Sequence, residues 1–210
     1  MNENLKGLIA KAEQGDIEAM AMVGDCYQKG FHVEKDDKIS HRYYQKAADA
    51  GHAKAALMVA INYLNGIGVS KNMKLGAKYL QSAADKGMAY AQYLLAVLYH
   101  NRKIGLFFCE QKAMNYYEMA ARQGDAKSQI QLADLIWKDK NSKYSLNDMI
   151  FWLVCAYLHR LNNESMEESN VALQRLNTLI ESGLPGGKAR IEETINTVKK
   201  QYPTYLKNPF

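Results

Sequence analysis

The chain has 210 residues, 48% of them hydrophobic and 23% charged, which is enough to bury a sizeable core and excludes a disordered chain or a disulfide-stapled miniprotein. The formal net charge of +5 is mild, and lysines and arginines are scattered among carboxylates instead of forming a dense basic block. Proteins that bind nucleic acid usually need such a block, so no nucleic-acid partner is expected. The three prolines all follow residue 184, and alanine, methionine and tyrosine are plentiful, which favours helix over strand.

Three cysteines, Cys26, Cys109 and Cys155, are far apart and form no CxxC pair, so they are expected to be free thiols. The N-terminal residues lack the basic head and apolar core of a signal peptide. No apolar run is long enough to span a membrane. These observations lead us to expect a cytoplasmic protein with no membrane partner.

The first predicted element is a short helix over Leu5–Ala12, which is followed by four similar segments. The segments begin at Gly15, Gly51, Gly87 and Gly124, so that the sequence repeats with a period of 36 or 37 residues. A fixed period of this length is typical of helical solenoids.

The first helix of each repeat, which we call helix A, has small or apolar residues 4, 8, 9 and 12 positions after the glycine. These positions lie on one face of a helix and predict a closely packed stripe. The small residues at the ninth position are Gly24, Ala60, Ala96 and Ala133.

In the first three repeats the second helix, helix B, has an aromatic residue eight positions before the next repeat glycine and small residues four and five positions after that aromatic residue. In the last repeat Trp152 takes the aromatic place, and Ala156 and Tyr157 stand four and five positions after it. We expect the aromatic ring to pack against small residues of a neighbouring helix. The aromatic residues are Tyr43, Tyr79, Tyr116 and, in the last repeat, Trp152.

Turn residues separate the two helices of each repeat. Gly30 and Gly66 are placed to end helix A in the left-handed conformation. Asp36, Asn72 and Ser145 are suited to cap the N-terminus of helix B.

The third repeat departs from this pattern, because Arg102 replaces the turn glycine and Cys109 stands at the cap position. We expect its loop, residues 101–109, to be irregular. Beyond Trp152 the pattern fades into two further predicted helices, from Glu164 to about Ser182 and from about Gly187 to Tyr202.

The second repeat, GHAKAALMVAINYLNGIGVSKNMKLGAKYLQSAADKG, resembles the Sel-one-like repeat, which is related to the tetratricopeptide repeat. The resemblance covers about residues 8–160. It implies an all-α fold, a right-handed α-solenoid of about four helix-turn-helix repeats of 36–37 residues with a divergent helical C-terminal cap. The expected organisation is therefore a solenoid over residues 1–160 and a cap and tail over residues 161–210, because a solenoid needs a polar cap on its terminal face.

The resemblance also implies an adaptor that holds another protein or a peptide in a concave groove lined by helix A. The candidate groove positions lie 3, 6, 7 and 10 residues after each repeat glycine, where the middle repeats are apolar and the end repeats are polar. The alternative is that these side chains belong to the core. The candidate binding residues are Lys54, Leu57, Met58, Ile61, Tyr90, Tyr93, Leu94, Val97, Lys127, Ile130 and Asp134.

Two other functions remain open at this stage. One is an immunity protein that neutralises a cognate bacterial toxin, and the other is an enzyme or a small-molecule binder. The five histidines form no HExxH or HxH motif, and the sequence has no GxSxG elbow, P-loop or dinucleotide fingerprint. We therefore predict no catalytic residue, no cofactor and no metal site.

Overall fold

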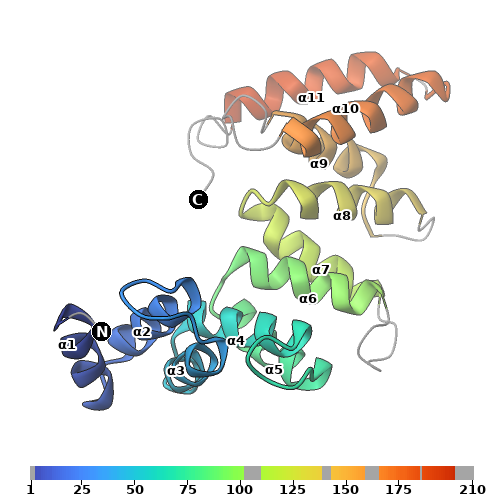
Figure 1. Cartoon of the computed structure of the whole chain (residues 1–210). Helices are drawn as coiled ribbons and strands as arrows, with labels where there is room; N and C mark the ends of the chain where they lie inside the picture. Colours follow the sequence, from blue (N-terminus) through green and yellow to red (C-terminus); the bar gives the residue numbers. More distant parts are fainter. Residues whose placement is uncertain (1–2, 102–109, 139–142, 159–165, 185, 202–210) are drawn as a thin grey trace. The chain divides into compact units, whose positions relative to one another are not determined.

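The structure is a computed structural model that describes residues 3–101, 110–138, 143–158, 166–184 and 186–201. These residues form eleven helices and no strand, in agreement with the predicted all-α fold (Figure 1). The described helices are not long and apolar enough to cross a membrane. Of the predicted irregular loop, residues 101–109, only Asn101 is described, and residues 202–210 also lie outside the described part of the chain.

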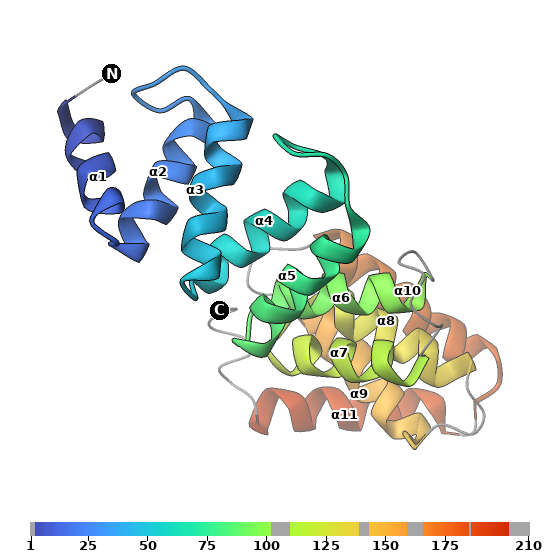
Figure 2. The same ribbon diagram turned by 90° about the horizontal axis from the view of Figure 1, so that it is seen from below.

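The chain divides into two compact units, and the first spans Met1–Phe108. Each of its helices packs against the next one along the chain, as Figures 1 and 2 show for α1 to α5. In this unit α2, α4 and α6 are helices A, and α3 and α5 are helices B. The helices are α1 (Glu3–Glu13), α2 (Ile17–Lys29), α3 (Asp37–Asp49), α4 (Ala53–Asn65), α5 (Met73–Asp85) and α6 (Ala89–His100).

The second unit spans Cys109–Phe210, and its central helix α9 packs against α8, α10 and α11. The last two helices begin and end within about two residues of the predicted bounds. The boundary between the two units falls between helix A and helix B of the third repeat. The predicted boundary near residue 160, between the solenoid and its C-terminal cap, stays a prediction. The helices are α7 (Glu110–Arg122), α8 (Ala126–Lys138), α9 (Leu146–Leu158), α10 (Met166–Glu181) and α11 (Gly187–Gln201).

The predicted caps of helix B are confirmed. The Asp36 carboxylate accepts hydrogen bonds from two backbone N–H groups of the first turn of α3, both at 2.9 Å, and the Asn72 side chain accepts one from Leu75 at 3.0 Å. At the start of α9, the Ser145 hydroxyl accepts from the backbone N–H of Asp148, whose carboxylate in turn accepts from Ser145. Each capping side chain accepts hydrogen bonds from backbone N–H groups that have no acceptor within the helix.

The predicted glycine turns are also confirmed. Gly30 and Gly66 end α2 and α4 with φ of 69° and 78°. In this left-handed region a side chain would clash with the backbone, which explains the glycines.

The packing of helix A on helix B depends on a large residue facing a small one. The residue that fills the space above Gly24 is Tyr44, which is 1% exposed, and a methyl group on Gly24 would lie only 2.7 Å from its ring. The predicted aromatic residue is the one before it, Tyr43. Its ring is stacked on Tyr27, with 6.3 Å between the ring centroids, and its hydroxyl donates to Glu13 of α1 at 3.1 Å.

The second repeat has the same arrangement. Tyr79 stacks on Tyr63 at 5.9 Å and donates its hydroxyl to Asp49 of the preceding repeat at 2.8 Å. The helix B aromatic residue therefore joins helix A of its own repeat to helix B of the repeat before it.

Gly68 allows two successive repeats to approach closely. It has φ of 66°, and a methyl group at this position would lie 2.0 Å from the backbone oxygen of Asp37, at the start of α3. At the corresponding position of the first repeat, His32 adopts φ of 62° and is exposed. Residue 68 must therefore be glycine for two reasons: its φ is positive, and the backbone of Asp37 leaves no room for a side chain.

We predict that Gly68→Ala destabilises the protein much more than Gly15→Ala. Gly15 also has positive φ, 96°, but a methyl group there would meet no atom within 4 Å. Both variants lose about 1–2 kcal/mol from left-handed strain, and Gly68→Ala loses at least about 1–3 kcal/mol more from the clash. Urea unfolding of both variants checks this, and equal losses would contradict the close contact with Asp37.

A buried polar pair lies between α3 and α4. His41 is 4% exposed and Asn62 is 2% exposed, and Nδ2 of Asn62 lies 3.3 Å from Nδ1 of His41. Among the described residues, Nε2 of His41 and Oδ1 of Asn62 have no hydrogen-bond partner. Burial lowers the pKa of His41, because the charged imidazolium loses its hydration.

This pair makes the stability of the fold depend on pH. The pKa of His41 lies below its ordinary value of 6.5 in the folded protein, so the unfolded chain binds more protons just below pH 6.5. The contribution of neutral, buried His41 to the free energy of unfolding is complete above pH 6.5. As the pH falls below that value the free energy of unfolding decreases, by at most about 1.4 kcal/mol per pH unit. We predict that urea unfolding at pH 7.5 and 5.5 gives a larger loss of stability for the natural protein than for His41→Gln. The other titrating groups are shared, so equal losses would contradict this prediction.

Candidate protein-binding site

The helix A positions that the sequence singled out differ in their exposure to solvent. Lys54 and Tyr90 are exposed, and Tyr90 retains 50% of its accessible surface. Apart from Leu57, which is buried, the remaining candidates of α4 and α6 are partly buried. They are Met58, Ile61, Tyr93, Leu94 and Val97.

The prediction of exposure is wrong for Leu57 and Ile130, which are 7% and 5% exposed. Both stand six positions after their repeat glycine, and this position borders the buried stripe when 3.6 residues make one helical turn. Ala21, at the same position in the first repeat, is buried as well. Ile130 packs in a cluster with Ala126 of its own helix and small residues of α9 and α10. These two side chains belong to the core.

Two side-chain pairs connect the neighbouring helices A of the first two repeats. Nζ of Lys54 on α4 lies 3.6 Å from the carboxylate of Asp25 on α2. Nε2 of His52 lies 3.1 Å from Glu18 of α2, while its Nδ1 accepts the backbone N–H of Ala55 at 3.0 Å and caps α4. His52 therefore has a structural role at the helix start.

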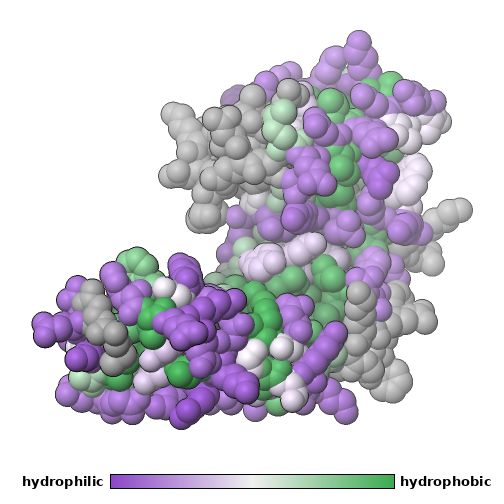
Figure 3. Space-filling view, viewed as in Figure 1, coloured by the Kyte–Doolittle hydropathy of each residue, from purple (hydrophilic) through white to green (hydrophobic). Residues whose placement is uncertain are grey.

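The surface of the first unit, which we call the unit 1 surface, is apolar over α4 and α6. Figure 3 shows apolar side chains over α4 beside the mainly polar side chains over α2. The rings of Tyr90 and Tyr93 stack with 6.2 Å between their centroids. The apolar residues of the unit 1 surface are Met58, Ile61, Tyr90, Tyr93, Leu94 and Val97.

In the second unit, the candidates of α8 pair with residues of α10. Lys127 lies 3.5 Å from Glu168, and the carboxylate of Asp134 accepts hydrogen bonds from Nε and Nη2 of Arg175 at 3.1 and 3.4 Å. Each pair joins a helix A to the helix that follows the last helix B.

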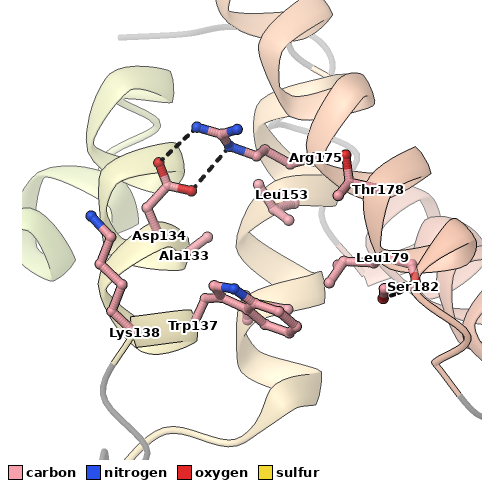
Figure 4. A pocket seen from close by; sticks show the side chains of 10 residues that line it. Ala133, Asp134, Trp137, Lys138, Leu153, Arg175, Thr178, Leu179 and Ser182 are labelled. Atoms are coloured by element: carbon pink, nitrogen blue, oxygen red, sulfur yellow. Dashed lines mark hydrogen bonds and ion pairs between the residues drawn. The ribbon is translucent and has the colours of Figure 1, made fainter.

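A cavity of about 290 Å³ lies beside the Asp134–Arg175 pair and is bounded by α8, α9 and α10 (Figure 4). We call it the α8–α10 pocket. Its lining residues are Ala133, Asp134, Trp137, Lys138, Met149, Leu153, Arg175, Thr178, Leu179 and Ser182.

Of the residues that line this pocket, only Asp134 is among the candidate binding residues predicted from the sequence. Trp137 is not among them. The indole of Trp137 is 58% exposed, although large aromatic side chains are usually well buried. The signal was present in the sequence, because Trp137 follows Asp134 by three residues and therefore lies on the same face of α8. The α10 residues that complete the pocket could not be found, since α10 does not follow the repeat pattern.

Within the described ranges, no group of three or more His, Cys, Asp and Glu side chains is arranged to hold a metal ion. Burial raises the pKa of the Cys155 thiol to about 12 and also raises that of Cys26. Both groups are therefore protonated thiols near neutral pH.

Part of the chain matches a known family of repeats. Sel1 repeats match the sequence over residues 17–52, 53–88 and 89–125. No curated protein matches the sequence.

Solved structures share the fold. A protective antigen of uropathogenic Escherichia coli with an SLR fold is 24% identical and has a TM-score of 0.64, over 92% of this chain and 43% of its own. This chain thus spans less than half the length of that antigen. A Sel1 repeat protein from Oxalobacter formigenes is 26% identical with a TM-score of 0.64, over 77% of this chain and 71% of its own.

An immunity protein from Pseudomonas aeruginosa aligns over 98% of this chain and 74% of its own, but its identity of 16% and TM-score of 0.43 are too low to support an argument. The two closer likenesses confirm the predicted all-α solenoid. Because the three matched repeats cover more than half of the sequence, the chain belongs to the Sel1 repeat family.

Proposed function

We propose that this chain is a scaffold that binds a partner protein through the unit 1 surface. Sel1 repeat proteins generally bind other proteins. Stacked helix pairs place successive helices A side by side, so that side chains from several repeats form one extended surface. The family match supports the binding function, and the exposure of side chains on α4 and α6 supports its location on the unit 1 surface.

The observation that carries the proposal is the stacked pair of Tyr90 and Tyr93 on α6. Partly exposed apolar residues stand on the same helix, at Val97, and on helix A of the preceding repeat, at Met58 and Ile61. Tyrosine contributes a large, rigid contact area and is enriched among residues that dominate binding energy. The half-exposed ring of Tyr90 argues against the alternative that this face is part of the core. The Lys54–Asp25 and His52–Glu18 pairs lie between α2 and α4, and polar groups of this kind are usual around a protein-binding site.

Lys54 of the predicted groove belongs to one of these pairs. Its ammonium group is paired with Asp25, and its side chain keeps 63% of its accessible surface. Such an exposed pair contributes little to stability, and its role in the proposal is to orient a charged partner. The immunity function stays a prediction that no observation on this chain favours.

We predict that Tyr93→Ala combined with Tyr90→Ala abolishes capture of the specific partner. A central tyrosine contributes at least about 2 kcal/mol to binding in such sites, which corresponds to about thirtyfold in Kd. The measurement is affinity capture from the native host followed by quantitative mass spectrometry, and then titration of the purified partner with each variant.

Leu75→Ala is the matched control, because Leu75 is 36% exposed on α5 of the same unit and lies on a helix B. This variant should bind like the natural protein. If the tyrosine variant keeps the helical content and the partner affinity of the Leu75 variant, the unit 1 surface is not the binding site.

A further inference from the structure

We propose that the α8–α10 pocket is a second binding site, which takes a partner segment that carries a large apolar side chain next to a carboxylate. This site lies in the second unit and uses none of the residues of the unit 1 surface. It can therefore be tested independently of the function proposed above.

The inner part of the pocket is apolar. Met149 and Leu153 of α9 and Leu179 of α10 are buried core residues whose side chains reach the cavity wall, and Ala133 of α8 leaves space between them. Figure 4 shows Leu153, Ala133 and Leu179 around the centre of the cavity, with Trp137 along one side. An apolar side chain that enters this space is removed from water on several sides, which favours binding through the hydrophobic effect.

The size of the pocket favours one side chain over a whole small molecule. Its volume of about 290 Å³ lies just below the range of about 300–1,000 Å³ for small-molecule sites. Trp137, at its edge, is 58% exposed, so the apolar surface continues beyond the cavity. A chain segment can fill the cavity with one side chain and cover the indole with its neighbours.

The charges at the rim select an acidic partner. Asp134 is neutralised by Arg175, whose guanidinium donates two of its five N–H groups to that carboxylate. Lys138 also lines the pocket, and it has no ion pair among the described residues. Among the described lining residues, one carboxylate against two cations leaves one positive charge, which is complementary to an Asp or Glu of the bound segment.

The test begins with selection of random twelve-residue peptides displayed on phage against the immobilised full-length chain. We expect the enriched peptides to share a large apolar residue within two positions of Asp or Glu. A synthetic peptide of the consensus sequence, labelled with fluorescein, is then titrated by fluorescence anisotropy. Failure to enrich such peptides, or enrichment of a motif without an acidic residue, would overturn the proposal.

Two variants locate the bound peptide. Trp137→Leu should weaken binding at least tenfold, whereas Phe31→Leu should not, although Phe31 is equally exposed at 59%. Lys138→Glu should weaken binding of the acidic peptide and strengthen binding of a peptide with Lys in place of Asp or Glu. Lys188→Glu, at an exposed position of α11, is the control for the change of charge.

Two further outcomes distinguish a peptide in this pocket from a peptide on the unit 1 surface and from a small bound carboxylate. If Tyr90→Ala with Tyr93→Ala removes peptide binding and Trp137→Leu does not, the peptide occupies the unit 1 surface and the pocket proposal fails. If 3-phenylpropionate binds the pocket as tightly as the peptide, the site takes a small carboxylate and not a chain segment. Circular dichroism of every variant confirms that loss of binding is not loss of fold.

Discussion

The structure of the first two repeats depends on a small residue of one helix facing a large side chain of the other. Gly24 accommodates the ring of Tyr44, and Gly76 of α5 comes so close to Leu64 of α4 that a methyl group would lie 2.7 Å from its Cδ2. Such contacts leave no room for larger residues, because protein interiors are already packed as densely as organic crystals. The inward face of helix A is thereby fixed, and the residues on its opposite face remain available to solvent.

The sequence was sufficient to predict the elements of regular structure. A period repeated several times identifies both helices, and local chemistry such as the side chain of Asp36 and the left-handed Gly66 determines where they begin and end. The two C-terminal helices were also predicted, although they fall outside the repeat. These features depend on neighbours within one or two helical turns, which a sequence displays directly.

The candidate site could be predicted only in part. Leu57 and Tyr93 occupy the same repeat position, yet the first is buried and the second is partly exposed, because burial at the border of a helical stripe depends on the helices beside it. The pocket near Trp137 needs Arg175 and Leu179, which come from a helix without a repeat counterpart. Contacts across about 40 residues of divergent sequence leave no periodic pattern to recognise.

The tyrosine–carboxylate bonds of the first unit have a consequence for how it folds and opens. Tyr43 reaches Glu13 and Tyr79 reaches Asp49, each across 30 residues, so these bonds connect adjacent repeats. Chains dominated by such short sequence separations fold fast, since little loop entropy is lost before a contact forms. Cooperativity is then transmitted from neighbour to neighbour, and amide protons at the α1 end can exchange through fraying that leaves α4 and α5 folded.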